Sequence, residues 1–87
     1  FIWTNNIYEI EEFTKKLNIS NYTIVNSDSA INDFHLFKFS KHFIVGPSTF
    51  HWWGAWLNQN NNKICVRPSE MNPSNNLNFW PDEWIEI

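Results

Sequence analysis

Short apolar runs alternate with segments of helical period along this chain of 87 residues. Each apolar run is bounded by polar or turn-forming residues and is too short to be a buried helix. Strands that alternate with helices pair in parallel, and helices cover both faces of the resulting sheet. The pattern therefore predicts an α/β fold, a Rossmann-like half domain with a short parallel sheet. The predicted strands are residues 1–3, 22–25, 43–45 and 63–67, and the predicted helices are residues 7–17, 31–40 and 50–57.

Polar signals mark the start of the first predicted helix and the end of the last predicted strand. Asn6 and Glu9 have the spacing of a capping box, with Asn in place of Ser or Thr. After Pro68 the chain contains Pro73 and Pro81 and follows neither a helical nor a strand period. We therefore predict that the tail is irregular.

Both ends of the sequence fall inside apolar runs. The chain begins with Phe1-Ile2-Trp3 and no Met, and it stops within Trp84-Ile85-Glu86-Ile87. A chain of this length is expected to form one small domain. We therefore expect residues 1–87 to be a single domain or subdomain of a larger protein.

Composition excludes several classes of function. The net charge is -3 and the six Lys and Arg residues are scattered, whereas nucleic-acid binding needs a concentrated basic surface. No apolar run approaches the roughly 18 residues of a membrane span. The aromatic fraction of 18% and the hydrophobic fraction of 43% are sufficient for a core. We therefore expect a globular domain that does not bind nucleic acid.

Residues that often hold metals or form disulfides are sparse. Cys65 is the only cysteine and lies in an apolar run, which favours a buried structural thiol. His35, His42 and His51 have no zinc-site spacing. We therefore expect no metal site and no cofactor.

The turn between the third predicted strand and the third predicted helix is the strongest candidate site. Ligands of open α/β sheets bind at the carboxyl ends of the strands. Gly46 allows a close approach of a ligand to the backbone. Ser48 and Thr49 place hydroxyl groups beside the free N–H groups of the helix start. Two interpretations stay open on these residues alone: an anion site suited to a phosphate, and a helix cap without a ligand.

Three tryptophans follow in the same segment. Trp52, Trp53 and Trp56 lie on the third predicted helix, and Trp52 and Trp56 share a face. Aromatic residues of a helix pack in cores more often than they bind ligands. We therefore predict that these side chains are mainly structural, and that replacing Trp53 or Trp56 by Ala would unfold the segment.

Residues 33–57, DFHLFKFSKHFIVGPSTFHWWGAWL, resemble the alpha-1,2-fucosyltransferase family, which is glycosyltransferase family 11. The resemblance rests on the long motif Ser-Thr-Phe-x-Trp-Trp-Gly-Ala-Trp-Leu. The segments KICVRP and FWPDEWIEI resemble the next strand and the closing segment of the family, and FIWTNNIYEIEEF resembles an upstream segment. The resemblance therefore covers nearly the whole chain.

The resemblance implies an inverting transferase of the two-domain GT-B type, which moves fucose from GDP-fucose to a galactoside hydroxyl in α-1,2 linkage. This chain would be much of the C-terminal half, which binds the donor. Its partners would be GDP-fucose, a galactoside acceptor and the N-terminal part of the same protein. The implied location is the cytoplasm in a bacterium, with possible peripheral membrane association, or the Golgi lumen in a eukaryote.

The resemblance also implies roles for individual residues. Asp33 matches the position that contacts guanine, and Ser48, Thr49 and Phe50 match the turn that contacts the diphosphate. Gly46 and His51 flank that turn and complete the predicted donor site. No catalytic residue is assigned within the chain, because the Arg-containing motif of the family is absent from these residues, so the segment by itself is predicted to be inactive.

The sequence departs from the family pattern at the turn and near its start. Pro47 stands where the family has Asn, His51 stands where it has Ser, and Asn5 and Asn6 replace two carboxylates. One alternative is therefore a non-catalytic domain that retains the fold. A further alternative is a carbohydrate-binding module that stacks sugars on exposed tryptophans, for which Trp80 and Trp84 are the candidates.

Overall fold

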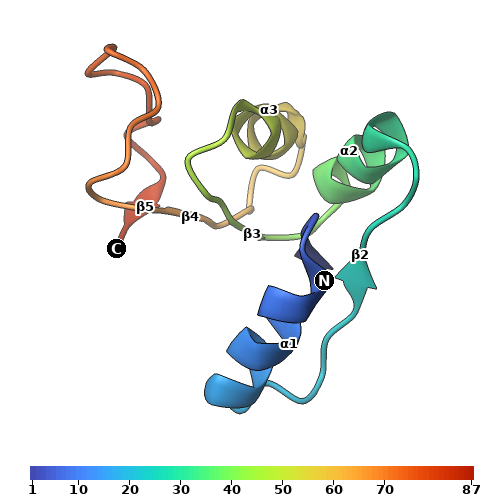
Figure 1. Ribbon diagram of the computed structural model, residues 1–87. Coiled ribbons are helices and arrows are strands. Elements are labelled where there is room, and N and C mark those ends of the chain that lie inside the picture. Colours follow the sequence, from blue (N-terminus) through green and yellow to red (C-terminus); the bar gives the residue numbers. More distant parts are fainter. The chain divides into compact units, whose positions relative to one another are not determined.

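The first unit of the chain is a small strand–helix–strand assembly. The computed structural model describes residues 1–87, and it divides them into two compact units, residues 1–33 and 34–87. In the first unit, β1 (Ile2–Trp3) and β2 (Ile24–Val25) pair in parallel and α1 (Ile7–Lys16) connects them (Figure 1). The two strands and the helix lie where the sequence predicts them.

The start of α1 follows half of the predicted capping box. The side-chain oxygen of Asn6 accepts a hydrogen bond of 3.4 Å from the N–H of Glu9. The N–H of Asn6 donates to the hydroxyl of Thr4 rather than to the Glu9 side chain. Asn6 therefore satisfies one of the free N–H groups of the helix start.

The second unit contains a three-stranded parallel sheet. The strands β3 (Phe43–Ile44), β4 (Cys65–Arg67) and β5 (Ile85–Glu86) pair in that order, with Phe43 opposite Cys65 and Val66 opposite Ile85. The helix α2 (Ala30–Lys38) begins in the first unit and ends in the second, before β3, and α3 (Thr49–Leu57) connects β3 to β4. The sequence predicted β3 and β4, whereas β5 lies in the tail that was expected to be irregular.

Aromatic side chains form most of the core of the second unit. Phe37 of α2 packs edge-on against Phe43 of β3, at 5.1 Å between ring centres. The absence of a side chain at Gly54 allows α3 to approach α2, because a Cβ atom there would overlap the Phe37 ring. The buried apolar residues are Phe37, Phe43, Val45, Ala55, Cys65, Trp80 and Trp84.

The tail after β4 is held by its tryptophans rather than by regular structure. The indole N–H of Trp80 donates to the carbonyl of Met71, and the indole N–H of Trp52 donates to the carbonyl of Phe79. Trp80 and Trp84 are 9% and 4% exposed. Neither presents a face to solvent, so the expectation that these two tryptophans are sugar-stacking platforms was wrong.

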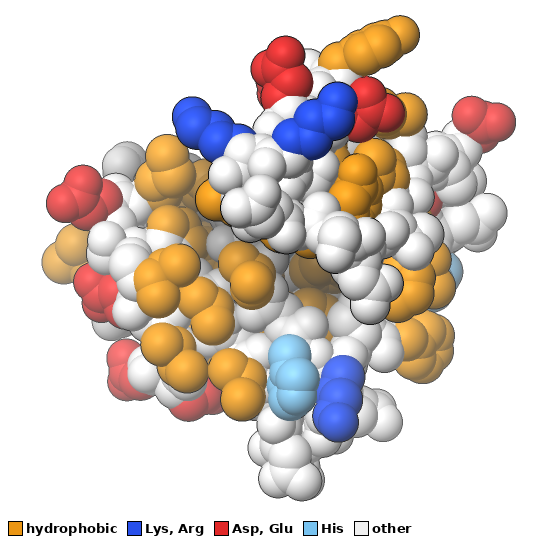
Figure 2. Space-filling view, turned by 90° about the horizontal axis from the view of Figure 1, so that it is seen from below, with side chains coloured by type: hydrophobic (Ala, Val, Ile, Leu, Met, Phe, Trp, Pro, Cys, Tyr) orange, Lys and Arg blue, Asp and Glu red, His pale blue; other side chains and the backbone are white.

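The face of the β3–β4–β5 sheet turned away from α3 is apolar and partly exposed. Ile44, Val66 and Ile85 lie in register across the three strands, and the side chain of Ile44 is 80% exposed. Figure 2 shows hydrophobic side chains among those exposed in the view from below. The prediction that helices cover both faces is therefore met on one face only within these residues.

Candidate functional site

The turn at the start of α3 is built by hydrogen bonds between its own residues. The N–H of Gly46 donates to Nδ1 of His51 at 2.9 Å, and the N–H of Ser48 donates to the carbonyl of Gly46 at 2.8 Å. Pro47 lies between these two residues and has no N–H to place. The structure therefore brings together the predicted residues Gly46, Ser48 and His51 in one turn after β3.

Donor groups at this turn are left without acceptors. Ser48 occupies the N-cap position of α3, but its side chain makes no capping hydrogen bond. The N–H groups of Thr49, Phe50 and His51 likewise have no acceptor within the chain. The first turn of α3 also contains no acidic residue. Free N–H groups and the positive end of the helix dipole are the elements of an anion site.

Phe50 contributes its backbone rather than its ring to the turn. The ring packs edge-on against Phe34 at 5.4 Å and lies 5.8 Å from Phe37, between ring centres. This packing anchors the first turn of α3 against the end of α2. The Phe50 N–H remains directed toward the helix start with those of its neighbours, as in any first helical turn.

His51 is a neutral acceptor in this structure. Its ring stacks on Phe37 at 5.4 Å, and burial lowers the pKa of the imidazole below its usual value of 6.5. Because Nδ1 accepts the Gly46 N–H, the ring proton of the neutral form lies on Nε2. The geometry therefore favours a neutral His51 ring that fixes the turn over a protonated ring that donates to a ligand.

Asp33 belongs to the first unit and is described with it. One oxygen of its carboxylate accepts a hydrogen bond of 3.2 Å from the N–H of Ser27, and its backbone carbonyl accepts from the indole of Trp3. The second carboxylate oxygen has no partner within the chain. The half-buried Asp33 is therefore held in place, and its second carboxylate oxygen is free to accept a hydrogen bond from a ligand.

Sequence reasoning missed a pocket of about 380 Å³ at the other end of α3. Trp56 and Lys63 line it together with Glu83 and Trp84 from the tail. The sequence separates these two groups by a long stretch without a period, so no local pattern joined them. The sequence signal that could have indicated the pocket is the pair Glu83-Trp84, an acidic and an aromatic residue that stand directly before β5.

No group of three or more His, Cys, Asp or Glu side chains is placed to hold a metal ion. None of the helices is long and apolar enough to cross a membrane.

Comparison with known proteins gives one family and two curated relatives. The model of glycosyl transferase family 11 matches residues 5–87. An O-antigen biosynthesis glycosyltransferase, WbnK, of Escherichia coli is 40% identical over 75 residues, which are 80% of this chain and 24% of the relative. An alpha-1,2-colitosyltransferase of Escherichia coli is 33% identical over 58 residues, which are 63% of this chain and 20% of the relative. The chain thus spans about a quarter or less of the length of these relatives. No solved structure matches the chain.

Proposed function

The chain belongs to glycosyl transferase family 11, and we propose that the whole protein is an inverting fucosyltransferase. It transfers fucose from GDP-fucose to a galactoside hydroxyl in α-1,2 linkage. The name of one relative, an alpha-1,2-colitosyltransferase, supports the linkage. The same relative makes colitose the alternative donor sugar for this protein.

The proposal rests on the free hydrogen-bond donors at the start of α3. The N–H groups of Thr49, Phe50 and His51 and the hydroxyl of Ser48 have no acceptors in the chain. Displacement of the sugar leaves negative charge on the diphosphate. Fixed N–H groups at the positive end of a helix stabilise such charge without having to reorganise. In the proposal, the turn therefore binds the diphosphate and favours its departure.

Binding of the donor also requires a group that recognises guanine and a cation beside the leaving group. Asp33 has a free carboxylate oxygen, and a carboxylate can accept hydrogen bonds from the N1–H and N2–H₂ groups of guanine. Residues 46–51 include no Lys or Arg. We therefore assign guanine to Asp33, and we assign the cation beside the leaving group to the remainder of the protein.

The sheet supports a Rossmann-like half domain of GT-B type. All strands pair in parallel, and parallel sheets are buried on both faces in α/β proteins. The row formed by the exposed Ile44 and Ile85 and the half-buried Val66 is the face that such a fold would cover with a helix layer. In the whole protein, we propose that helices cover this row.

A non-catalytic domain remains the alternative, because Pro47 removes one backbone donor from the turn. One observation supports the proposal of ligand binding over this alternative. Ser48 leaves its hydroxyl unbonded, although it stands at the N-cap position where Ser commonly satisfies the helix. A turn kept only as a helix cap would use that hydroxyl.

Two N-cap residues of the same chain provide the test. In the full-length protein, Ser48→Ala is expected to weaken GDP binding by about ten- to hundredfold, the effect of a lost hydrogen bond to a charged group. Its melting temperature should change little, because the hydroxyl makes no capping bond. Asn6→Ala removes a real cap and should show the reverse pattern, with lower stability and unchanged GDP affinity.

Calorimetric titration with GDP and thermal unfolding of both variants measure the two effects. Equal loss of stability in Ser48→Ala and Asn6→Ala, with GDP affinity intact in both, would make Ser48 a helix cap and remove the main support for the proposal.

A further inference from the structure

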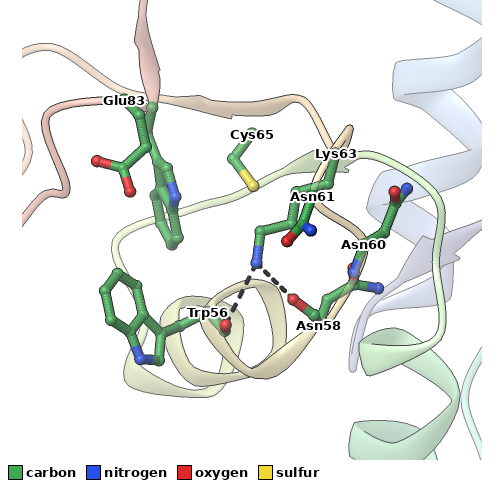
Figure 3. Close-up of a pocket in the computed structure, with 8 residues that line it drawn as sticks. Trp56, Asn58, Asn60, Asn61, Lys63, Cys65 and Glu83 are labelled. Carbon is green, nitrogen blue, oxygen red and sulfur yellow. Dashed lines mark hydrogen bonds between the residues drawn. The ribbon is translucent and has the colours of Figure 1, made fainter.

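The pocket at the C-terminal end of α3 is separate from the proposed donor turn. The turn lies at the carboxyl end of β3 and at the start of α3, whereas the pocket opens beside the end of α3 and the beginning of β4. Trp56, Lys63, Cys65, Glu83 and Trp84 line it (Figure 3). Its volume, about 380 Å³, is within the range of small-molecule sites, roughly 300 to 1,000 Å³.

The charges that line the pocket disfavour an anionic ligand. The ammonium group of Lys63 donates to the carbonyls of Ala55, Trp56 and Asn58 at the end of α3, at 2.6 to 3.2 Å. Its donors are therefore used within the chain. Glu83 has no ion-pair or hydrogen-bond partner. A nucleoside diphosphate would meet an unpaired carboxylate here and no free cation, which distinguishes this pocket from the turn.

The apolar part of the pocket consists of the stacked ring of Trp56 and the buried side chain of Cys65. Trp56 is 47% exposed, and its ring stacks on Trp52 at 5.2 Å between ring centres with 21° between the planes. The stack fixes the orientation of the half-exposed ring. Cys65 is buried, and burial raises the pKa of its thiol, so the sulfur is a neutral contact surface rather than a nucleophile.

The polar part of the pocket offers uncharged amides beside the carboxylate. The Asn61 side chain lines the pocket and makes no hydrogen bond within the chain. The amide of Asn58 is occupied, since its nitrogen donates to the carbonyls of Lys38 and Ser40. Asn61 and Glu83 therefore leave both donors and acceptors open among the residues that line the pocket.

We propose that this pocket binds a neutral saccharide, with a pyranose ring against Trp56 and its hydroxyl groups hydrogen-bonded to Asn61 and Glu83. A sugar presents an apolar C–H face and a rim of hydroxyls. Tryptophan attracts the former through its negative ring face, and amide and carboxylate groups bind the latter. The inference rests on the chemistry of the pocket and does not require the turn to bind GDP.

The half-exposed tryptophans of α3 provide a matched pair for the test. Trp56 lines the pocket, and Trp53, which is 51% exposed on the same helix, does not. In the full-length protein, lactose is the probe, followed by saturation-transfer NMR and calorimetric titration. Trp56→Ala is expected to weaken lactose binding by about tenfold or more, and Trp53→Ala is expected to leave it unchanged.

A second variant and a competition experiment complete the test. Asn61 lies in an exposed loop, so Asn61→Ala removes the proposed hydrogen bond to a sugar hydroxyl without disturbing the core. It should also weaken lactose binding, while GDP affinity stays at the wild-type value in all three variants. Excess GDP should not displace lactose. Equal lactose affinity of the Trp56→Ala and Trp53→Ala variants, no binding of lactose by a protein that binds GDP, or displacement of lactose by GDP would each overturn the proposal.

Discussion

Trp84→Ala is expected to lower the free energy of unfolding by about 3 to 5 kcal/mol, the usual cost of removing a buried tryptophan. The side chain is 4% exposed and lies 6.0 Å from the rings of both Trp52 and Trp80, between ring centres. It also directly precedes β5, so the cavity would loosen the pairing of β4 with β5. A loss of this size is a large share of the stability of a small domain, about 5 to 15 kcal/mol.

Trp53→Ala is the matched control for this prediction. Its side chain is half exposed, so its removal leaves no cavity and should cost far less stability. Urea unfolding of both variants of the full-length protein measures the difference. Comparable losses in the two variants would show that Trp84 does not hold the tail in the way that the structure describes.

Gly54→Leu is expected to destabilise the protein by about 3 kcal/mol or more, at the upper end of overpacking effects. A Cβ atom at this position would already overlap the ring of Phe37. A longer side chain forces α3 away from α2, although Leu favours the helix more than Gly by nearly 1 kcal/mol. Since Phe50 packs on Phe34 and Phe37, the movement should also disturb the turn at the start of α3.

Trp53→Leu introduces the same side chain into the same helix at an exposed position. It should change the unfolding midpoint only slightly and leave GDP binding intact, whereas Gly54→Leu should impair both. A Gly54→Leu variant as stable as Trp53→Leu would contradict the close approach of the two helices.

The order of helices and strands was predictable because it depends on local patterns. Polar caps such as Asn6, and apolar runs such as the one around Phe43, fix where an element begins and whether it is a helix or a strand. The predicted helix of residues 31–40 ends two residues earlier, at Lys38, and the others agree within one residue. The strand β5 escaped prediction because it closes a tail that contains Pro73 and Pro81 and follows no period.

The distribution of the tryptophans was not predictable from helical spacing. The spacing correctly put Trp52 and Trp56 on one face, and their rings do stack. It did not show which face the tail would cover. Phe79 and Trp84 pack on Trp52 and leave Trp53 and Trp56 half exposed, so the prediction that Trp53 and Trp56 are core residues was wrong.

The candidate donor site was predictable in position but not in its hydrogen bonds. A strand, a small-residue turn and a helix start are local, so Gly46, Ser48 and Thr49 could be singled out from the sequence. The acceptor role of His51 depends on the packing of its ring against Phe37, which joins two helices. The pocket at the far end of α3 depends on chain segments that only the folded tail brings together.

The central claim is that the free N–H groups at the start of α3 bind the diphosphate of a guanine nucleotide. Amide NMR spectra of the isotope-labelled full-length protein, titrated with GDP and in parallel with guanosine, test it directly, because guanosine has the base and lacks the phosphates. We expect the amide signals of Thr49, Phe50 and His51 to shift with GDP and not with guanosine, and those around Asp33 to shift with both. Signals of residues 49–51 that stay in place at saturating GDP would contradict the claim.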